Sequence, residues 1–132
     1  MKYYIDTCIW LNLFQKEGDS SKGTPYWKIA EDFLTNNTEL FTSTIVLKEL
    51  QRKIHMNLIN KFLQKVNLIR TKSEDYDFAR QIESENMYQL SFGDCMHIAI
   101  CKRLQFTLIT RDRNLISVSK QYIQVSKPET LY

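Results

Sequence analysis

The chain has 132 residues, of which 43% are hydrophobic and 25% are charged. This length suffices for one core and is short for two ordinary domains, and only 3 Gly and 2 Pro argue against long disordered stretches. No apolar run approaches the roughly 18 residues that a membrane helix needs. A net charge of +3 permits a nucleic-acid partner without requiring one. We therefore expect a single domain over residues 1–132 with no membrane segment.

The cysteines and the first residues bear on the cellular compartment. Cys8, Cys95 and Cys101 form an odd set without a CxxC pair, which is typical of free thiols in a reducing compartment. The opening MKYYIDTCIW resembles a signal peptide, but Asp6 and Asn12 interrupt it and no small-residue cleavage site follows. We expect a cytoplasmic protein.

The chain alternates between predicted strands and helices. Short apolar or β-branched runs predict strands at residues 3–5, 39–42, 68–71, 106–110 and 122–125. Helical spacing and capping residues predict helices at 7–14, 26–36, 43–53, 55–66, 73–87 and 91–103, with Ser73 as one N-cap, and residues 15–25 read as a loop. This alternation predicts a three-layer α/β/α sandwich with a central, mostly parallel sheet of about four or five strands.

Four acidic residues stand at the junctions of these elements, and each has an ordinary structural explanation. Asp6 can cap the helix that follows it, and Asp112 in TRDRN can serve as a turn or cap residue. Glu49 can form surface pairs three or four residues along its helix, and Asp94 completes a capping box in SFGD. Taken singly, none of them indicates a function.

Their joint placement favours a metal site. Two of the acids directly follow strands, one opens an apolar helix and one lies on a helix after a strand. These positions can converge at one edge of a parallel sheet, and ligands of parallel sheets bind at the carboxyl ends of the strands. Carboxylates that converge there repel one another unless a cation lies between them. Oxygen ligands of this kind suit Mg²⁺, or Mn²⁺ as a substitute, better than Zn²⁺.

The segments YIDTCIW, TSTIVLKEL, FGDCMHIAI and LITRDRNL resemble the four signature blocks of PIN domains, and most closely those of VapC-like toxins. The resemblance runs through nearly the whole chain in order. It implies a metal-binding and catalytic set, supported by neighbouring hydroxyl groups: Asp6, Glu49, Asp94 and Asp112, with Thr7, Ser43 and Thr110. Asn114 and Leu115 depart from the commonest pattern, as does Cys95.

The resemblance also implies an activity and partners. It implies a Mg²⁺-dependent endoribonuclease that hydrolyses RNA phosphodiester bonds, the toxin of a pair with a VapB-like antitoxin, and a homodimer. Three alternatives stay open: a free-standing RNA-processing nuclease, a non-catalytic RNA-binding module, and an unrelated hydrolase or phosphatase in which the acids are helix caps.

Basic residues near the acidic blocks are candidates for contacts with substrate phosphates, foremost the two that flank Asp112. The candidates are Arg111, Arg113, Lys48 and Arg52, with Lys53 nearby. The spacing Asp94-x-x-His97 occurs in metal sites, but the apolar neighbours of His97 favour a packed helix histidine.

Overall fold

The computed structural model describes residues 2–15 and 23–130. Within them, five strands form one sheet in the order β3-β2-β1-β4-β5, and every pairing is parallel. The strands are β1 (Tyr3–Ile5), β2 (Leu40–Ser43), β3 (Asn67–Ile69), β4 (Thr107–Ile109) and β5 (Val125–Ser126). The expected parallel sheet is confirmed, with five strands and no antiparallel pair among the described residues.

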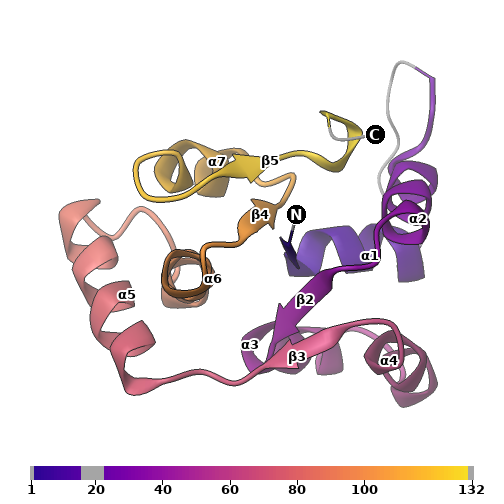
Figure 1. Cartoon of the computed structure of the whole chain (residues 1–132), viewed down its shortest axis with the longest axis horizontal. Helices are drawn as coiled ribbons and strands as arrows, with labels where there is room; N and C mark the ends of the chain where they lie inside the picture. The colour runs from indigo at the N-terminus through magenta and orange to yellow at the C-terminus, as the bar shows by residue number, and fades with distance from the viewer. Residues whose placement is uncertain (1, 16–22, 131–132) are drawn as a thin grey trace.

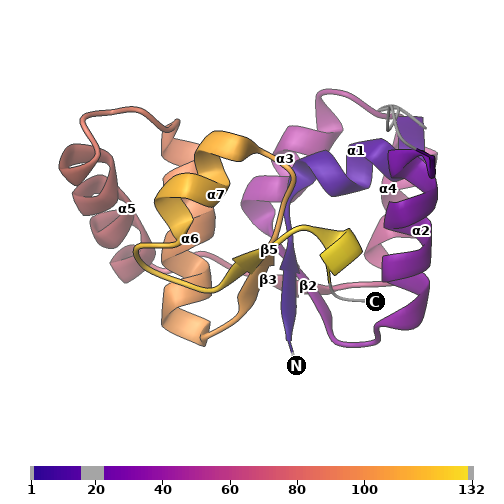
Figure 2. The ribbon, with the colours of Figure 1, turned by 90° about the horizontal axis from the view of Figure 1, so that it is seen from above.

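Helices cover both faces of this sheet, as expected for a three-layer α/β/α sandwich. They are α1 (Thr7–Gln15), α2 (Tyr26–Asn36), α3 (Thr44–Gln51), α4 (Met56–Leu63), α5 (Ser73–Glu85), α6 (Phe92–Leu104) and α7 (Arg113–Ser119), with a 3₁₀ turn at η1 (Pro128–Thr130). Figures 1 and 2 show α1, α2 and α4 on one side of the sheet and α5, α6 and α7 on the other. No helix in the described part of the chain is long and apolar enough to cross a bilayer.

Strand β1 occupies the middle of the sheet and is buried along its length. Tyr3 pairs with Leu40 on one side and with Thr107 on the other, so the first strand is joined to segments 37 and 104 residues further along the chain. All three residues of β4 are also buried. Strands covered on both faces read as continuous apolar runs, which explains why both could be predicted.

Helix α6 is the central helix of the second layer, because it lies between the sheet and α5. Seven consecutive residues, from Cys95 to Cys101, are buried, as an apolar helix with neighbours on several sides requires. The helix begins at an N-cap, Ser91, whose Oγ accepts a hydrogen bond from the Asp94 N–H at 3.2 Å. It ends where Gln105 adopts a left-handed conformation, a common helix stop.

A buried ion pair fastens α5 to α6. The Asp75 carboxylate is 1% exposed and accepts two hydrogen bonds from Arg103, at 2.8 Å from Nε and 3.0 Å from Nη2. It also accepts the Lys72 N–H at 2.9 Å, so the N-cap of α5 is Lys72 and the expectation that Ser73 caps this helix is wrong. A bidentate guanidinium and a backbone N–H together compensate a charge that would be costly to bury alone.

Several boundaries differ from the sequence prediction. Helices α4 and α5 are shorter than expected, and β5 lies three residues later, at Val125–Ser126. Helix α7 was not predicted. Its seven residues are too few for helical periodicity to stand out, and Asp112 was assigned to an ordinary loop. Most of the loop predicted at 15–25 lies outside the described residues.

Candidate metal centre

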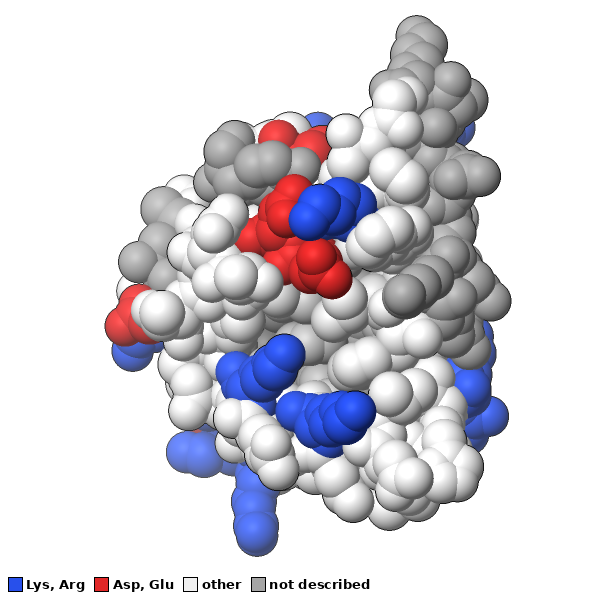
Figure 3. Space-filling model, turned by 90° about the vertical axis from the view of Figure 1, so that its right-hand side faces the viewer, with Lys and Arg blue, Asp and Glu red and all other residues white. Residues whose placement is uncertain are grey.

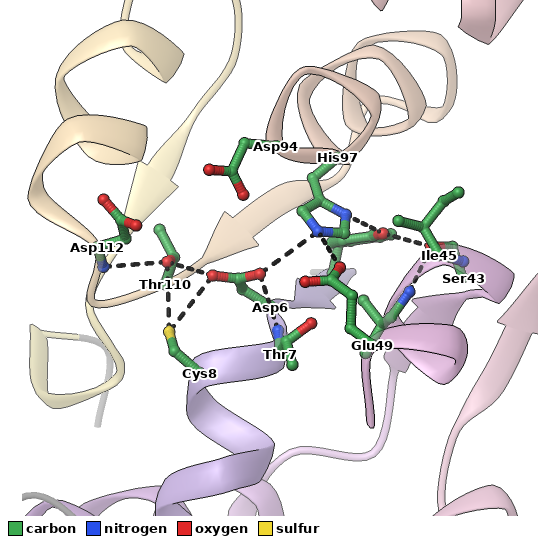
Figure 4. A network of polar contacts seen from close by, with 12 residues as sticks. Asp6, Thr7, Cys8, Ser43, Ile45, Glu49, Asp94, His97, Thr110 and Asp112 are labelled. Carbon is green, nitrogen blue, oxygen red and sulfur yellow. Dashed lines mark hydrogen bonds and ion pairs between the residues drawn. The ribbon is translucent and has the colours of Figure 1, made fainter. Parts of the chain in front are cut away.

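The candidate site lies at the carboxyl edge of the sheet, where β1, β2 and β4 end side by side. Asp6 directly follows β1, Ser43 is the last residue of β2, and Thr110 directly follows β4. Because these strands are parallel neighbours, three segments that are distant in sequence deliver polar side chains to one place (Figure 4).

Asp6 is buried and held by its neighbours. Its Oδ2 accepts hydrogen bonds from the Thr110 hydroxyl at 2.7 Å and the Cys8 thiol at 3.3 Å, and its Oδ1 accepts the Thr7 N–H at 2.8 Å. Only 6% of the residue is exposed. These donors fix the orientation of the carboxylate, and they include the thiol of Cys8, which was not among the predicted site residues.

Asp94 reaches the same place from the first turn of α6. Burial raises the pKa of its carboxyl group to about 6, and the charges of Asp6, Asp112 and Glu49 add to that effect, while His97 opposes it. No hydrogen bond or ion pair joins its side-chain oxygens to another described residue. Its negative charge therefore lacks the compensation that Arg103 gives to Asp75.

Glu49 and His97 complete the inner part of the site. His97 is fully buried on α6, and its Nε2 lies 3.1 Å from Glu49 Oε1 and 3.5 Å from Asp6 Oδ1. Burial favours a higher pKa for Glu49, but the hydrogen bond and charge of His97 outweigh it and the pKa is lowered. Burial favours a lower pKa for His97, but its hydrogen bond to Glu49 and the surrounding carboxylates outweigh it and the pKa is raised.

The apolar neighbours of His97 favoured a packed role for this residue, and its burial bears that out. His97 was not among the predicted site residues, however, because apolar neighbours on both sides hide a polar contact made through the fold. The Asp94-x-x-His97 spacing was the available signal.

Asp112 is linked to the centre through Thr110. Its backbone N–H donates to the Thr110 hydroxyl at 3.2 Å, and that hydroxyl donates to Asp6. Its Oδ1 caps α7 by accepting the N–H groups of Asn114 and Leu115 at 2.9 and 3.1 Å. Asp112 is thus both the cap residue that its position suggested and an exposed acid at the rim of the site.

The donor set fits a divalent cation. One ligand atom each from Asp6, Asp94 and His97 lies within 4.8 Å of the others, close enough for one ion to contact all three residues. Glu49 joins this group through His97, and Asp112 stands further out. Carboxylate oxygens that raise one another's pKa gain most when a cation lies between them.

The basic candidates divide into two kinds. Lys48, Arg52 and Arg113 are exposed and free to meet a polyanion at the surface. Arg111 is 11% exposed: its Nη1 pairs with Glu129 at 2.8 Å, and its guanidinium lies 3.9 Å from the centre of the Tyr26 ring. Arg111 therefore fastens η1 and the start of α2, and Arg113 is the arginine beside Asp112 that faces solvent.

The face that carries α1, α2 and α4 has charges of both signs. Figure 3 shows acidic side chains grouped around a basic one, with other basic side chains lying apart from them. On α2, Lys28 pairs with Glu31 at 3.3 Å and with Asp32 at 3.2 Å. This mixture agrees with the mild net charge and gives this face no uniform field.

Comparison with known proteins identifies the family. A model of the PIN domain matches residues 3–121, and the chain belongs to the PIN domain family. No curated protein matches the chain closely enough to be reported as a relative. The expected family is thereby confirmed, and the fold is that of the VapC-type PIN proteins among the solved structures.

Three solved structures illustrate the similarity of fold. VapBC2 from Rickettsia felis, bound to a DNA fragment of its promoter, has a TM-score of 0.71 at 20% identity, covering 96% of this chain and 98% of that one. A toxin-antitoxin complex from Klebsiella pneumoniae has 0.73 at 19%, with the same coverage. VapC20 from Mycobacterium tuberculosis, described as a toxin that cleaves the sarcin-ricin loop, has 0.62 at 15%, covering 88% and 94%.

Proposed function

We propose that the protein is a metal-dependent endoribonuclease and the toxin of a toxin-antitoxin pair. The observation that carries this proposal is the group of carboxylates at the carboxyl edge of a PIN-domain sheet, above all Asp94, which has no described hydrogen-bond or ion-pair partner and lies beside Asp6. VapC-type toxins of the same fold, one of them described as a toxin that cleaves the sarcin-ricin loop, support the choice of substrate.

The chain would contribute fixed ligands and a polar surround. Asp6 and Asp94 would hold a Mg²⁺ or Mn²⁺ ion, Glu49 would join them from α3, and Asp112 would orient a water at the rim through its second carboxylate oxygen. A bound divalent ion lowers the pKa of a water ligand and neutralises charge on the phosphate oxygens. Thr110, Thr7 and Cys8 keep Asp6 in place through the hydrogen bonds described above.

A cleavage assay with matched variants tests the activity. We expect a structured RNA to be cut with Mg²⁺ or Mn²⁺ but not with EDTA, and Asp6→Asn and Asp94→Asn to lower the rate by about a thousandfold, the equivalent of several kcal/mol of lost transition-state stabilisation. Asp77→Asn, which neutralises an exposed acid on α5, serves as the control and should cleave normally. Cleavage that survives EDTA and both site variants would refute the proposal.

The substrate backbone needs cations at the rim, and Arg113 is the first candidate. The next candidates are Lys48 on α3 and Arg52, the C-cap residue of that helix. We expect Arg113→Gln to raise KM several-fold with little change in kcat, because a single exposed phosphate contact contributes positioning and modest affinity. Lys102→Gln is the control, since this exposed lysine lies in the last turn of α6, a helix length away from Asp94. An equal rise in KM for both variants would assign the effect to net charge alone.

The same proposal includes partners and a compartment. Solved complexes of toxins with antitoxins support a VapB-like antitoxin, and we also infer a homodimer that acts in the cytoplasm, where free thiols such as Cys8, Cys95 and Cys101 persist. Light scattering of the purified chain, alone and coexpressed with the product of an adjacent reading frame, tests the dimer and the antitoxin separately.

A further inference from the structure

A buried hydrogen-bond chain runs from the start of α3 to the candidate metal centre. The Tyr4 phenol oxygen lies 2.6 Å from Ser43 Oγ and 2.7 Å from His97 Nδ1. All three residues are fully buried, and they come from β1, β2 and α6. Figure 4 shows His97 between Ser43 on one side and Asp6 and Glu49 on the other.

The N-cap of α3 sets the direction of this chain. A serine hydroxyl has one proton to donate and two lone pairs that accept. Ser43 Oγ already accepts the N–H groups of Ile45 at 3.2 Å and Val46 at 3.5 Å. Its own proton therefore goes to the Tyr4 oxygen, and the Tyr4 proton goes to His97 Nδ1.

The opposite direction is unfavourable. If Tyr4 donated to Ser43, the serine oxygen would have to accept three hydrogen bonds, and its own proton would lose its acceptor. With Nδ1 accepting, the neutral imidazole carries its proton on Nε2.

The Nε2 proton faces the metal centre. Nε2 lies 3.1 Å from Glu49 Oε1 and 3.5 Å from Asp6 Oδ1, so it donates to carboxylates and presents no lone pair to an ion. His97 is near enough to serve as a ligand, but this tautomer prevents it. The ligands left to the ion are oxygens, which Mg²⁺ prefers, whereas an imidazole nitrogen would favour Zn²⁺.

We propose that the N-cap of α3, acting through Tyr4, fixes His97 as a positioning residue that donates to Glu49 and Asp6 and makes the site select Mg²⁺ over Zn²⁺. This inference rests on the proposed function in one respect, namely that Asp6 and Asp94 bind a divalent ion. The tautomer itself is a property of the chain and can be measured without any metal.

The first test is the tautomer of His97, read from long-range ¹H–¹⁵N NMR spectra of the metal-free protein in mildly alkaline buffer and again with Mg²⁺. The expected result is an Nε2–H ring in both. His55, the other histidine in the sequence, is exposed and serves as the internal comparison. An Nδ1–H ring, or a ring protonated on both nitrogens under these conditions, would overturn the inference.

The second test compares metal affinities by titration calorimetry, using Mg²⁺ and Zn²⁺ alone as probes. Tyr4→Phe removes the donor to Nδ1, so the ring proton can move to Nδ1 and leave a lone pair on Nε2 for an ion. We therefore expect the ratio of Zn²⁺ to Mg²⁺ affinity to rise about tenfold, the lower end of the effects that residues behind the direct ligands have on metal sites. Tyr3→Phe is the matched control on the same strand, because Tyr3 packs its ring edge against Phe33 at 5.2 Å instead.

A third variant separates positioning from ligation. His97→Gln retains an amide N–H that can donate toward Glu49 but has no ring nitrogen, so the ratio should not rise. A fall in Zn²⁺ affinity with Mg²⁺ affinity unchanged would show that the wild-type ring is a ligand and overturn the inference, as would equal shifts in Tyr4→Phe and Tyr3→Phe. A wild-type protein that binds no Mg²⁺ would refute the proposed function, while the metal-free tautomer would still be decided.

Discussion

Asp75 on α5 and Asp94 on α6 occupy equivalent places in two helices of the second layer, but their carboxylates have different surroundings. Each lies in the first turn of its helix; Asp75 is buried and Asp94 is half-buried. Asp75 receives two hydrogen bonds from Arg103 and one from a backbone N–H, whereas Asp94 has neighbouring carboxylates and a pKa raised to about 6. A buried acid with a cationic partner contributes to the structure of the fold. An acid without such a partner marks a place where an external cation would be stabilising.

Removing the partner of Asp75 should have the largest effect on stability. We expect Arg103→Leu to lower the free energy of unfolding by about 3 kcal/mol, because it leaves a buried charge unpaired. Urea denaturation measures this loss, and Lys102→Leu, at the neighbouring exposed position of α6, is the control. A loss below about 1 kcal/mol would show that Asp75 depends little on its cationic partner, and the contrast between Asp75 and Asp94 would not hold.

Supplying the missing partner of Asp94 should have the next largest effect. Mg²⁺ at a hundred times its dissociation constant should stabilise the wild-type protein by about 2.7 kcal/mol, since it binds the folded state alone. Thermal melts with and without Mg²⁺ detect the shift. Asp94→Asn should lose it, and Arg103→Leu, which leaves the site intact, should keep it; the reverse pattern would contradict the comparison.

Neutralising Asp94 itself should have a smaller effect that depends on pH. Because burial raises the pKa of Asp94 from its usual 3.8 to about 6, the folded protein retains a proton that the unfolded chain has already released between those values. Wild-type stability should therefore fall as the pH rises through this window. With allowance for partial exposure, metal-free Asp94→Asn should be more stable by about 1–2 kcal/mol above the window and equal to wild type below it.

Urea titrations of both proteins at several pH values, with EDTA throughout, check this difference. A variant that is less stable than the wild type at neutral pH would show that the negative charge of Asp94 is already compensated within the chain.

Much of this fold could be predicted because its signals are local. Strand β1 and helix α2 were predicted with the observed bounds, and the SFGD segment begins helix α6 with Ser91 as its N-cap. The start of α5, by contrast, is fixed by a distant contact. The N-cap of α5 depends on Asp75, whose orientation Arg103 sets, and that pairing leaves no trace in the local sequence.

The candidate site also contains some residues that could be predicted from the sequence and others that could not. The ends of parallel strands must lie along one edge, so the positions of Asp6 and Asp112 beyond β1 and β4 were enough to predict that they would approach each other. The role of His97 could not be predicted in this way, because its partner on the far side of the ring is Tyr4, a residue of a buried strand that reads as plain core. Which of these residues bind a metal stays a prediction that the proposed assays test.

The order of the strands also bears on how the protein is made. Strand β1 is synthesised before its neighbour β4, which begins at Thr107, so the middle of the sheet stays incomplete until β4 has left the ribosome. Asp6 and Thr110 cannot meet before then. A translation product that stops short of residue 107 would lack a complete candidate site, and any activity of that site would begin only after β4 and Thr110 have been synthesised.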